Sequence, residues 1–304
     1  MAKKKNSIEN SWNKENVLSD YRLAVLSRNL SVLGRREVLT GKAKFGIFGD
    51  GKEVVQIALA RQFRNGDWRS GYYRDQTWMM AMGLYDSLEF FHQLYGNTDA
   101  DVSHGSQGRV FNNHFSVPNI NPDGTWRDLT KQKNSSSDIS PTAGQMPRLL
   151  GLAYASKLFR QNKELHKYSS LSVKGDEVAF GSIGDASTSE GHFWETMNAA
   201  GVLQVPMAIS VYDDGYGISV PKTDQTANRK VSDNFTGFLN LHIIQCNGKD
   251  VFDSVNAMID AKKQQLVWQG RGTKTLDPSA SQQKREENIN YAVKEIFKKY
   301  PPVL

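Results

Sequence analysis

Apolar residues recur along most of this chain at intervals of three and four, the spacing of a helix with one buried face. Shorter continuous apolar runs, typical of buried strands, end at Phe180 and cover residues 205–211 and 242–246. The helical spacing predicts helices over residues 17–39, 53–63, 79–95, 146–159, 192–203, 251–265 and 289–300.

The stretch from Gly181 to Pro221 indicates the fold class. It follows the strand that ends at Phe180, passes through a turn of small residues, and continues as a helix and a second strand. Two strands joined by one helix favour parallel pairing with a right-handed crossover. The sequence therefore predicts an α/β fold with a doubly wound, mostly parallel sheet and helices on both faces.

Polar stretches suggest the domain organisation. Residues 1–15 are polar and basic and predict a flexible N-terminus, while residues 16–304 form the α/β domain. Residues 119–137 and 269–288 are polar or rich in Gly, Ser and Gln, so we expect exposed loops there.

Composition excludes several classes of protein. The 304 residues are 38% hydrophobic and can bury a large core, and a net charge of +6 permits an acidic partner. Basic and aromatic residues do not alternate in a stripe, which argues against nucleic acid. A single cysteine, Cys246, rules out an internal disulfide. Apolar runs fall short of the ~20 residues that span a bilayer, and the start lacks a secretory pattern, so we expect a cytoplasmic protein.

Two acidic residues are the first candidates for a ligand-binding site. Asp185 and Asp214 follow the two strands of the central stretch, so both face the crevice at the carboxyl ends of a parallel sheet. Gly184 and Ala186 leave room for close backbone approach, and the free amides of a helix start favour an anion. Magnesium takes few oxygens from the protein and binds phosphate oxygens of the substrate as well, so a magnesium diphosphate is the expected ligand.

The segments GDASTSEG and DDGYGIS resemble the motif that binds thiamine diphosphate. They are most similar to the alpha portion of the decarboxylating component of 2-oxo acid dehydrogenases, of the branched-chain and pyruvate type, in bacterial forms with fused alpha and beta portions. The resemblance implies that Asp185, Asp214 and the Tyr216 carbonyl bind Mg²⁺, and that Gly184 and Ala186 contact the cofactor.

A second segment of the chain supports this resemblance. In the family, a Tyr-Arg pair holds the terminal phosphate of the cofactor, and Tyr73 and Arg74 stand at that place. A guanidinium forms bidentate bonds to phosphate, although Arg74 beside Asp75 could equally be a surface ion pair. Phe45 stands where the family has an aromatic wall of the substrate pocket, together with Tyr73, but an aromatic there could also be a core residue.

A third segment, SPTAGQMP, resembles a family segment that touches the cofactor and a structural potassium. Ser140, Thr142 and Gln145 match it, whereas Ile139 and Gly144 replace the expected hydroxyl ligands and put the potassium site in doubt. The loop HGSQGRVFNNHF carries Arg109 and His114 and resembles a family loop near the cofactor. His104 and His114 lack a third ligand at zinc spacing.

Two departures fall inside the proposed site. Asp213 and Asp214 replace a pair of Asn, and Tyr212 replaces an Arg. An Asp still offers a hard oxygen to magnesium, but negative charge is added where a cation is lost. We therefore expect the site to depend more on magnesium and on Arg74 than its relatives do.

The resemblance implies thiamine diphosphate-dependent oxidative decarboxylation of a 2-oxo acid, best 3-methyl-2-oxobutanoate, with acyl transfer to a lipoyl group of an acyltransferase core. Pyruvate is the nearest alternative substrate. The catalytic Glu of the family belongs to the beta portion, and its His and Arg belong to a loop that this sequence does not show. We expect activity to need a beta portion in an oligomer. A transketolase-like enzyme and a non-catalytic cofactor-binding scaffold remain alternatives.

Overall fold

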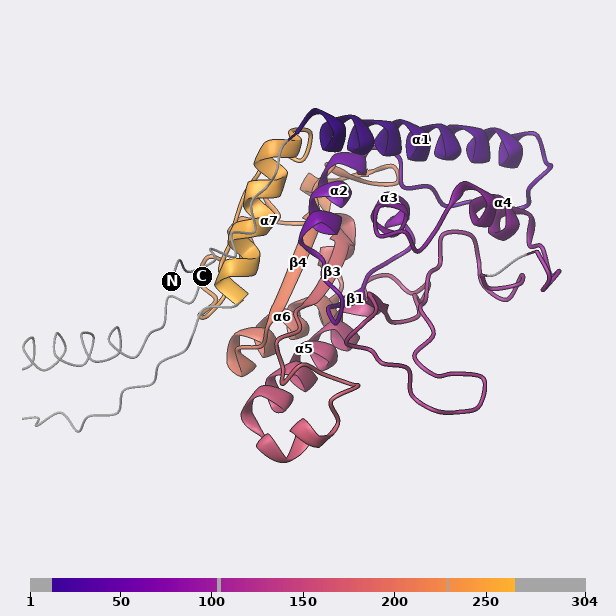
Figure 1. The fold of residues 1–304 in the computed structure, drawn as a ribbon. Coiled ribbons are helices and arrows are strands. Elements are labelled where there is room, and N and C mark those ends of the chain that lie inside the picture. Colours follow the sequence, from indigo (N-terminus) through magenta and orange to yellow (C-terminus); the bar gives the residue numbers. More distant parts are fainter. Residues whose placement is uncertain (1–12, 103–104, 229, 266–304) are drawn as a thin grey trace, which may run out of the picture. The chain divides into compact units, whose positions relative to one another are not determined.

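The computed structural model describes residues 13–102, 105–228 and 230–265 (Figure 1). The elements form one compact unit of residues 14–265. Its helices are α1 (Lys14–Leu39), α2 (Glu53–Gln62), α3 (Gln76–Ala81), α4 (Ser87–Tyr95), α5 (Gln145–Gln161), α6 (Gly191–Leu203) and α7 (Val251–Gln265). Its strands are β1 (Trp68–Ser70), β2 (Asn134–Ser135), β3 (Ala179–Gly184), β4 (Met207–Tyr212), β5 (Tyr216–Gly217) and β6 (Val220–Pro221). Short 3₁₀ turns are η1 (Lys163–Lys167), η2 (Ala186–Ser189), η3 (Lys222–Asp224) and η4 (Val231–Phe235).

The main sheet is parallel throughout, with strand order β2-β1-β3-β4. The chain goes from β1 to one neighbour, β2, then crosses to β3 on the other side of β1. The direction of winding therefore reverses between β1 and β3, and ligands of such folds bind at the carboxyl ends of strands beside that reversal. The predicted doubly wound α/β fold is confirmed.

Helices cover both faces of the sheet (Figure 1). On β3, Phe180 packs with Phe63 and Trp78 in a core on the side of α2 and α3. Ile183 lies on the opposite face and packs with α5 and α6. This alternation is the period-two pattern of a strand with both faces buried. The helix α1 lies outside α2, α3 and α4.

Three element predictions were wrong. The expected helix 79–95 is two helices, because the chain turns at Gly83, with φ of 73°, and Asp86 caps α4 by accepting a bond from the Glu89 amide. The strand that was expected to end at Phe180 runs on to Gly184. Residues 242–246 form no strand among the described residues.

Four strands were not predicted: β5 and β6, of two residues each, and the sheet strands β1 and β2. The strand β1 is polar in sequence, and β2 lies within residues 119–137, where we expected only a loop. Both are short, so neither shows a periodic pattern. Residues 269–288 and the expected helix 289–300 lie outside the described residues. Within the described ranges, no helix is long and apolar enough to cross a membrane.

Candidate functional site

Four segments meet at the carboxyl ends of the strands. They are the loop after β1, which ends at Arg74, the turn at Asp185 after β3, the loop at Asp213–Gly215 after β4, and the turn that leads into α2 at Lys52. The turns after β3 and β4 were predicted from the rule for parallel sheets, and the Arg74 loop was predicted only from the resemblance to the family. The fourth was not predicted, because residue 52 lies far along the chain from the others.

Asp185 is fixed at the centre of this arrangement. Its carboxylate accepts one bond from the Ala186 amide and another from the Gly215 amide, both at 2.9 Å. Only 4% of the residue is exposed. Burial raises the pKa of Asp185, the two amides oppose the rise, and Asp214 and Asp213 add to it. The bond to Gly215 brings the loops after β3 and β4 together.

Each member of the aspartate pair holds a lysine. Lys222 Nζ lies 2.6 Å from both carboxylate oxygens of Asp213. Lys52 Nζ lies 2.8 Å from Asp214 Oδ2. Two lysines of the same chain therefore balance the negative charge that this Asp pair has in place of two Asn. Neither lysine belongs to a motif, so neither was predicted from the sequence.

Arg74 and Tyr73 lie together beside the turn that precedes α2. The Arg74 guanidinium lies over the Tyr73 ring at 5.6 Å and donates to the Phe48 carbonyl at 2.8 Å. One of its nitrogens is thereby used for positioning the side chain. The alternative that Arg74 pairs with Asp75 is not what the structure has, because Asp75 is bound by Arg69 instead.

A buried ionic network supports the loop after β1. Arg69 is fully buried and binds Asp75 at 2.7 Å and Asp138 at 3.0 Å. Ser182 Oγ lies 2.6 and 2.7 Å from the oxygens of Asp75, and Tyr212 Oη lies 3.4 Å from it. The residue that replaces the expected arginine therefore joins this network.

Aromatic rings form a continuous wall on one side of the site. The Phe45 ring packs on Phe111 at 5.3 Å, Phe111 on His114 at 6.0 Å, and His114 on Tyr73 at 5.9 Å. Phe45 is 49% exposed, so it is not a core residue. His114 Nδ1 lies 3.2 Å from the Asn112 carbonyl, which can only accept, and Nε2 therefore accepts from Ser140 at 2.9 Å when the ring is neutral.

Some of the remaining predicted residues are buried and others are exposed. The backbone carbonyl of Thr142 accepts from His192 at 2.9 Å, and the buried Gln145 amide donates to the Ser182 carbonyl. Arg109 bonds within its own loop, to Ser106 and Gln107. The Tyr216 side chain is exposed, and its amide faces Asp214 Oδ1 at 3.5 Å.

The donor set suits a diphosphate and a hard cation. Among the described residues, no group of three or more His, Cys, Asp or Glu could hold a metal. Magnesium, however, needs only one or two carboxylates when phosphates complete its shell. Asp185 and Asp214 offer those oxygens. The Tyr72 hydroxyl is buried, has no hydrogen-bond partner among the described residues, and would lie 3.5 Å from a Cβ placed on Gly184.

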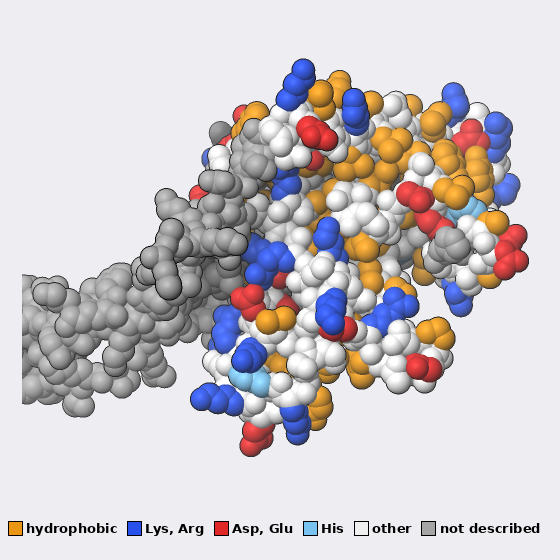
Figure 2. All heavy atoms as spheres, viewed as in Figure 1, with side chains coloured by type: hydrophobic (Ala, Val, Ile, Leu, Met, Phe, Trp, Pro, Cys, Tyr) orange, Lys and Arg blue, Asp and Glu red, His pale blue; other side chains and the backbone are white. Residues whose placement is uncertain are grey.

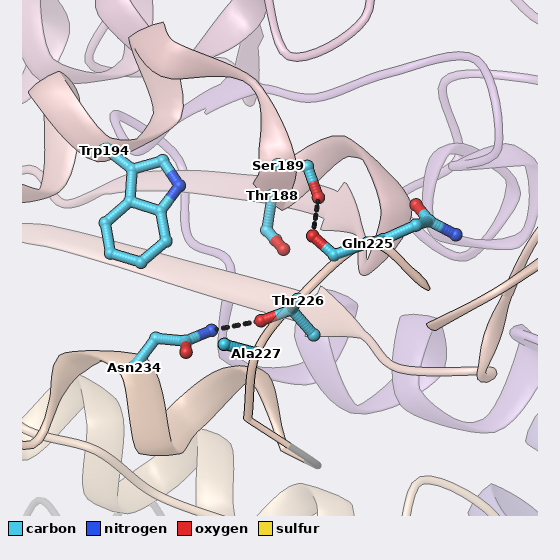
Figure 3. Close-up of a pocket in the computed structure, with 7 residues that line it drawn as sticks. All are labelled: Thr188, Ser189, Trp194, Gln225, Thr226, Ala227 and Asn234. Atoms are coloured by element: carbon cyan, nitrogen blue, oxygen red, sulfur yellow. Dashed lines mark hydrogen bonds between the residues drawn. The ribbon is translucent and has the colours of Figure 1, made fainter. Parts of the chain in front are cut away.

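A separate polar hollow lies beyond η2 (Figure 3). It is lined by Ser189 and Trp194 on one side and by Gln225 and Asn234 on the other. Ser189 donates to the Gln225 carbonyl at 3.0 Å, and Asn234 donates to Thr226 at 2.8 Å. None of the predicted site residues lines it, so it is distinct from the Asp185 site.

The chain is similar to known proteins over most of its length. The model of a family described as "Dehydrogenase E1 component" matches residues 21–270. A second model, "Domain of unknown function (DUF4136)", matches residues 255–302, most of which lie outside the described ranges.

Relatives of this chain include alpha subunits that are named for two different substrates. The mitochondrial 2-oxoisovalerate dehydrogenase subunit alpha of Caenorhabditis elegans is 27% identical over 75% of this chain and 45% of its own length. The 2-oxoisovalerate dehydrogenase subunit alpha of Bacillus subtilis is 26% identical over 80% of this chain and 64% of its own length. The pyruvate dehydrogenase E1 component subunit alpha of Acholeplasma laidlawii is 25% identical over 96% and 76%. The chain spans about half the length of the animal relatives it matches.

Proposed function

This chain belongs to the dehydrogenase E1 component family, and from that premise we propose that it is the cofactor-binding alpha portion of a thiamine diphosphate-dependent 2-oxo acid dehydrogenase. One observation carries the proposal. The carboxylate of Asp185, after β3, is bonded to Gly215, after β4, and Asp214 stands beside that contact. Arg74, after β1, supplies a cation to the same edge of the sheet.

In this proposal, Asp185, Asp214 and the Tyr216 carbonyl hold Mg²⁺, and Tyr73 and Arg74 hold the terminal phosphate. Gly184, Ala186, Ser140 and Thr142 contact the cofactor. Bound thiamine diphosphate supplies the nucleophilic and electron-accepting chemistry that protein side chains lack. The contribution of this chain is to bind and orient the diphosphate. Phe45 and Tyr73, at the two ends of the aromatic wall, border the substrate pocket and keep it apolar.

The substrate that we propose is a branched-chain 2-oxo acid, best 3-methyl-2-oxobutanoate, with transfer of the acyl group to a lipoyl arm of an acyltransferase core. Relatives named for 2-oxoisovalerate support this choice. Pyruvate is the second candidate, because a relative that aligns with 96% of this chain is named for it. We further propose that a beta portion completes the site.

Calorimetric titration of thiamine diphosphate with magnesium tests the half-site. We expect binding that chelator removes and that Asp185→Ala weakens by at least about tenfold, since even the partners behind a metal ligand cost about 10–100-fold when they are removed. Arg74→Ala removes a charge-assisted bond and should cost about tenfold or more.

Asp224→Asn is the control, because Asp224 is exposed and lies outside the contacts of the site. Its affinity should match that of the unsubstituted chain. Absence of binding up to about millimolar cofactor, equivalent to ~4 kcal/mol, would contradict the half-site. An Arg74→Ala variant within about twofold of wild type would remove Arg74 from the phosphate contact.

A further inference from the structure

Lys52 is placed unlike an ordinary surface lysine. It ends the turn that begins at Gly49, and its amide bonds to the Gly49 carbonyl at 3.3 Å. A Cβ on Gly49 would lie 2.5 Å from the Arg74 carbonyl, so this turn packs directly on the Arg74 loop. Only 11% of the Lys52 side chain is exposed, although its partner Asp214 is 53% exposed. Of the two side chains in this ion pair, that of Lys52 is thus the more buried.

The two lysines of the site differ in what they join. Lys222 and Asp213 are nine residues apart and belong to one hairpin region, and their contact is local. Lys52 and Asp214 are 162 residues apart, and their contact joins the turn before α2 to the loop after β4. Lys52 is therefore the cation that bridges the Arg74 side of the site and the proposed metal ligand.

The charge balance of the site explains why a cation is needed there. Tyr212, which stands where the family has an arginine, is buried with its hydroxyl near Asp75 and offers no positive charge. A diphosphate brings several negative charges next to Asp185 and Asp214. Arg74 supplies one positive charge, but one of its nitrogens already donates a hydrogen bond to the Phe48 carbonyl and is not free for phosphate.

We propose that Lys52 is a diphosphate-binding residue of this chain and takes the part left open by Tyr212. The proposal rests on the function proposed above. A metal held by Asp214 takes the carboxylate that now pairs with Lys52. Lys52, whose side chain is only 11% exposed, then needs another anion, because an unpaired charge on a mostly buried side chain is costly. A phosphate oxygen is the anion that the proposed ligand offers.

A second polar group points to the same ligand. The Tyr72 hydroxyl, in a residue that is 4% exposed, lacks a hydrogen-bond partner among the described residues and lies against Gly184. Buried hydroxyl groups are rarely left without a partner. An oxygen-rich ligand at the Asp185 turn would supply one.

Calorimetric titrations with magnesium, on the full chain, test the role of Lys52. Lys52→Met should weaken thiamine diphosphate binding about tenfold to a hundredfold, the effect of one charge-assisted bond. The same substitution should weaken the binding of thiamine monophosphate less, because this ligand has one phosphate fewer. Lys52→Arg keeps the charge and should recover most of the affinity. Lys131→Met is the matched control, since it removes a lysine that pairs with an aspartate, Asp128, but is 82% exposed and lies outside the site; it should change affinity less than about threefold.

The same series separates this inference from the proposed function. Binding that Asp185→Ala abolishes but Lys52→Met leaves unchanged would overturn the inference and keep the half-site. Lys52→Met could instead weaken the binding of both ligands equally and lower the urea midpoint of unfolding. If Lys52→Arg also failed to restore the affinity, Lys52 would be a structural residue only. No binding by the unsubstituted chain would overturn both proposals.

Discussion

Arg69 holds two carboxylates inside the protein, beneath the loop that carries Tyr73 and Arg74. Its guanidinium makes a bidentate contact with Asp138 and a forked one with Asp75, and all three side chains are fully buried. Charges in such a place are stable only because each has a partner. Burial raises the pKa of Asp75, while Arg69 opposes the rise.

Replacing Arg69 with Met should therefore be severe. It leaves two buried carboxylates without a cation and should lower the free energy of unfolding by about 3–5 kcal/mol. Urea denaturation at pH 7 measures the loss. Without Arg69 the pKa of Asp75 rises further, so the native state takes up protons more readily than the unfolded state, and stability recovers as pH falls from 7 toward 5.

Arg35→Met is the matched control for this change. Arg35 pairs with Asp50 at 2.8 Å, but its side chain is 52% exposed. Exposed pairs contribute only about 0.2–1 kcal/mol. Equal losses for the two variants, or a deficit at Arg69 that does not shrink at lower pH, would contradict the account of a buried network.

Single residues of the site were predictable only where a motif or a strand end marked them. Asp185 and Asp214 follow apolar runs, and parallel strands bring such positions together. Lys52 and Arg69 carry no such mark. Each gains its role from a partner far along the chain, at Asp214 and Asp138, and a single sequence does not record such pairings.

At the level of elements, the turn before α2 and the loop after β1 pack without space for a side chain at Gly49. We expect Gly49→Ala to push the Arg74 carbonyl, 2.5 Å from the new Cβ, and to lower the free energy of unfolding by about 1–3 kcal/mol as overpacking does. The Arg74 carbonyl also accepts a hydrogen bond from Gln56 at 2.7 Å, which holds the backbone of Arg74 in place. A shift of this backbone moves the Arg74 side chain and should therefore also weaken cofactor binding.

Gly191→Ala provides the comparison, since a Cβ there meets nothing within 4 Å. It lies at the start of α6, where alanine should raise stability by about 0.4–1 kcal/mol through the unfolded state. Unfolding midpoints and calorimetric affinities of both variants check the pair. A Gly49→Ala variant as stable as Gly191→Ala would mean that the turn has room to move.

Long helices were predictable, and short strands were not. The helix α7 begins where its apolar spacing indicated and reaches Gln265, the last described residue, and α1, α2, α5 and α6 agree within three residues of the expected ends. The strands β1 and β2 have three and two residues, and their polar side chains Arg69 and Asn134 make their bonds inside the protein. Their pairing depends on neighbours in space, so no periodic signal precedes it.

At the scale of the molecule, α1 presents an apolar stripe to solvent. Exposed hydrophobic side chains repeat at heptad spacing along one face, and such side chains gather over α1 and α4 in Figure 2. They are Leu18, Tyr21, Val25, Val32 and Leu39. A contiguous stripe of this kind marks a protein contact, and the beta portion that we propose is the partner that the function requires.

Leu18→Glu combined with Val25→Glu should weaken assembly with that beta portion, because both place charge in an apolar contact. Size-exclusion chromatography of the mixed portions should show less complex, and decarboxylation of 3-methyl-2-oxobutanoate should fall in proportion. Thiamine diphosphate binding by the chain alone should stay unchanged, since both replaced side chains are exposed on α1. Ser19→Glu adds charge to an exposed position of α1 that lies about 100° around the helix from Leu18, off the stripe, and should leave assembly intact. If both variants assemble equally well, the beta portion docks on another face.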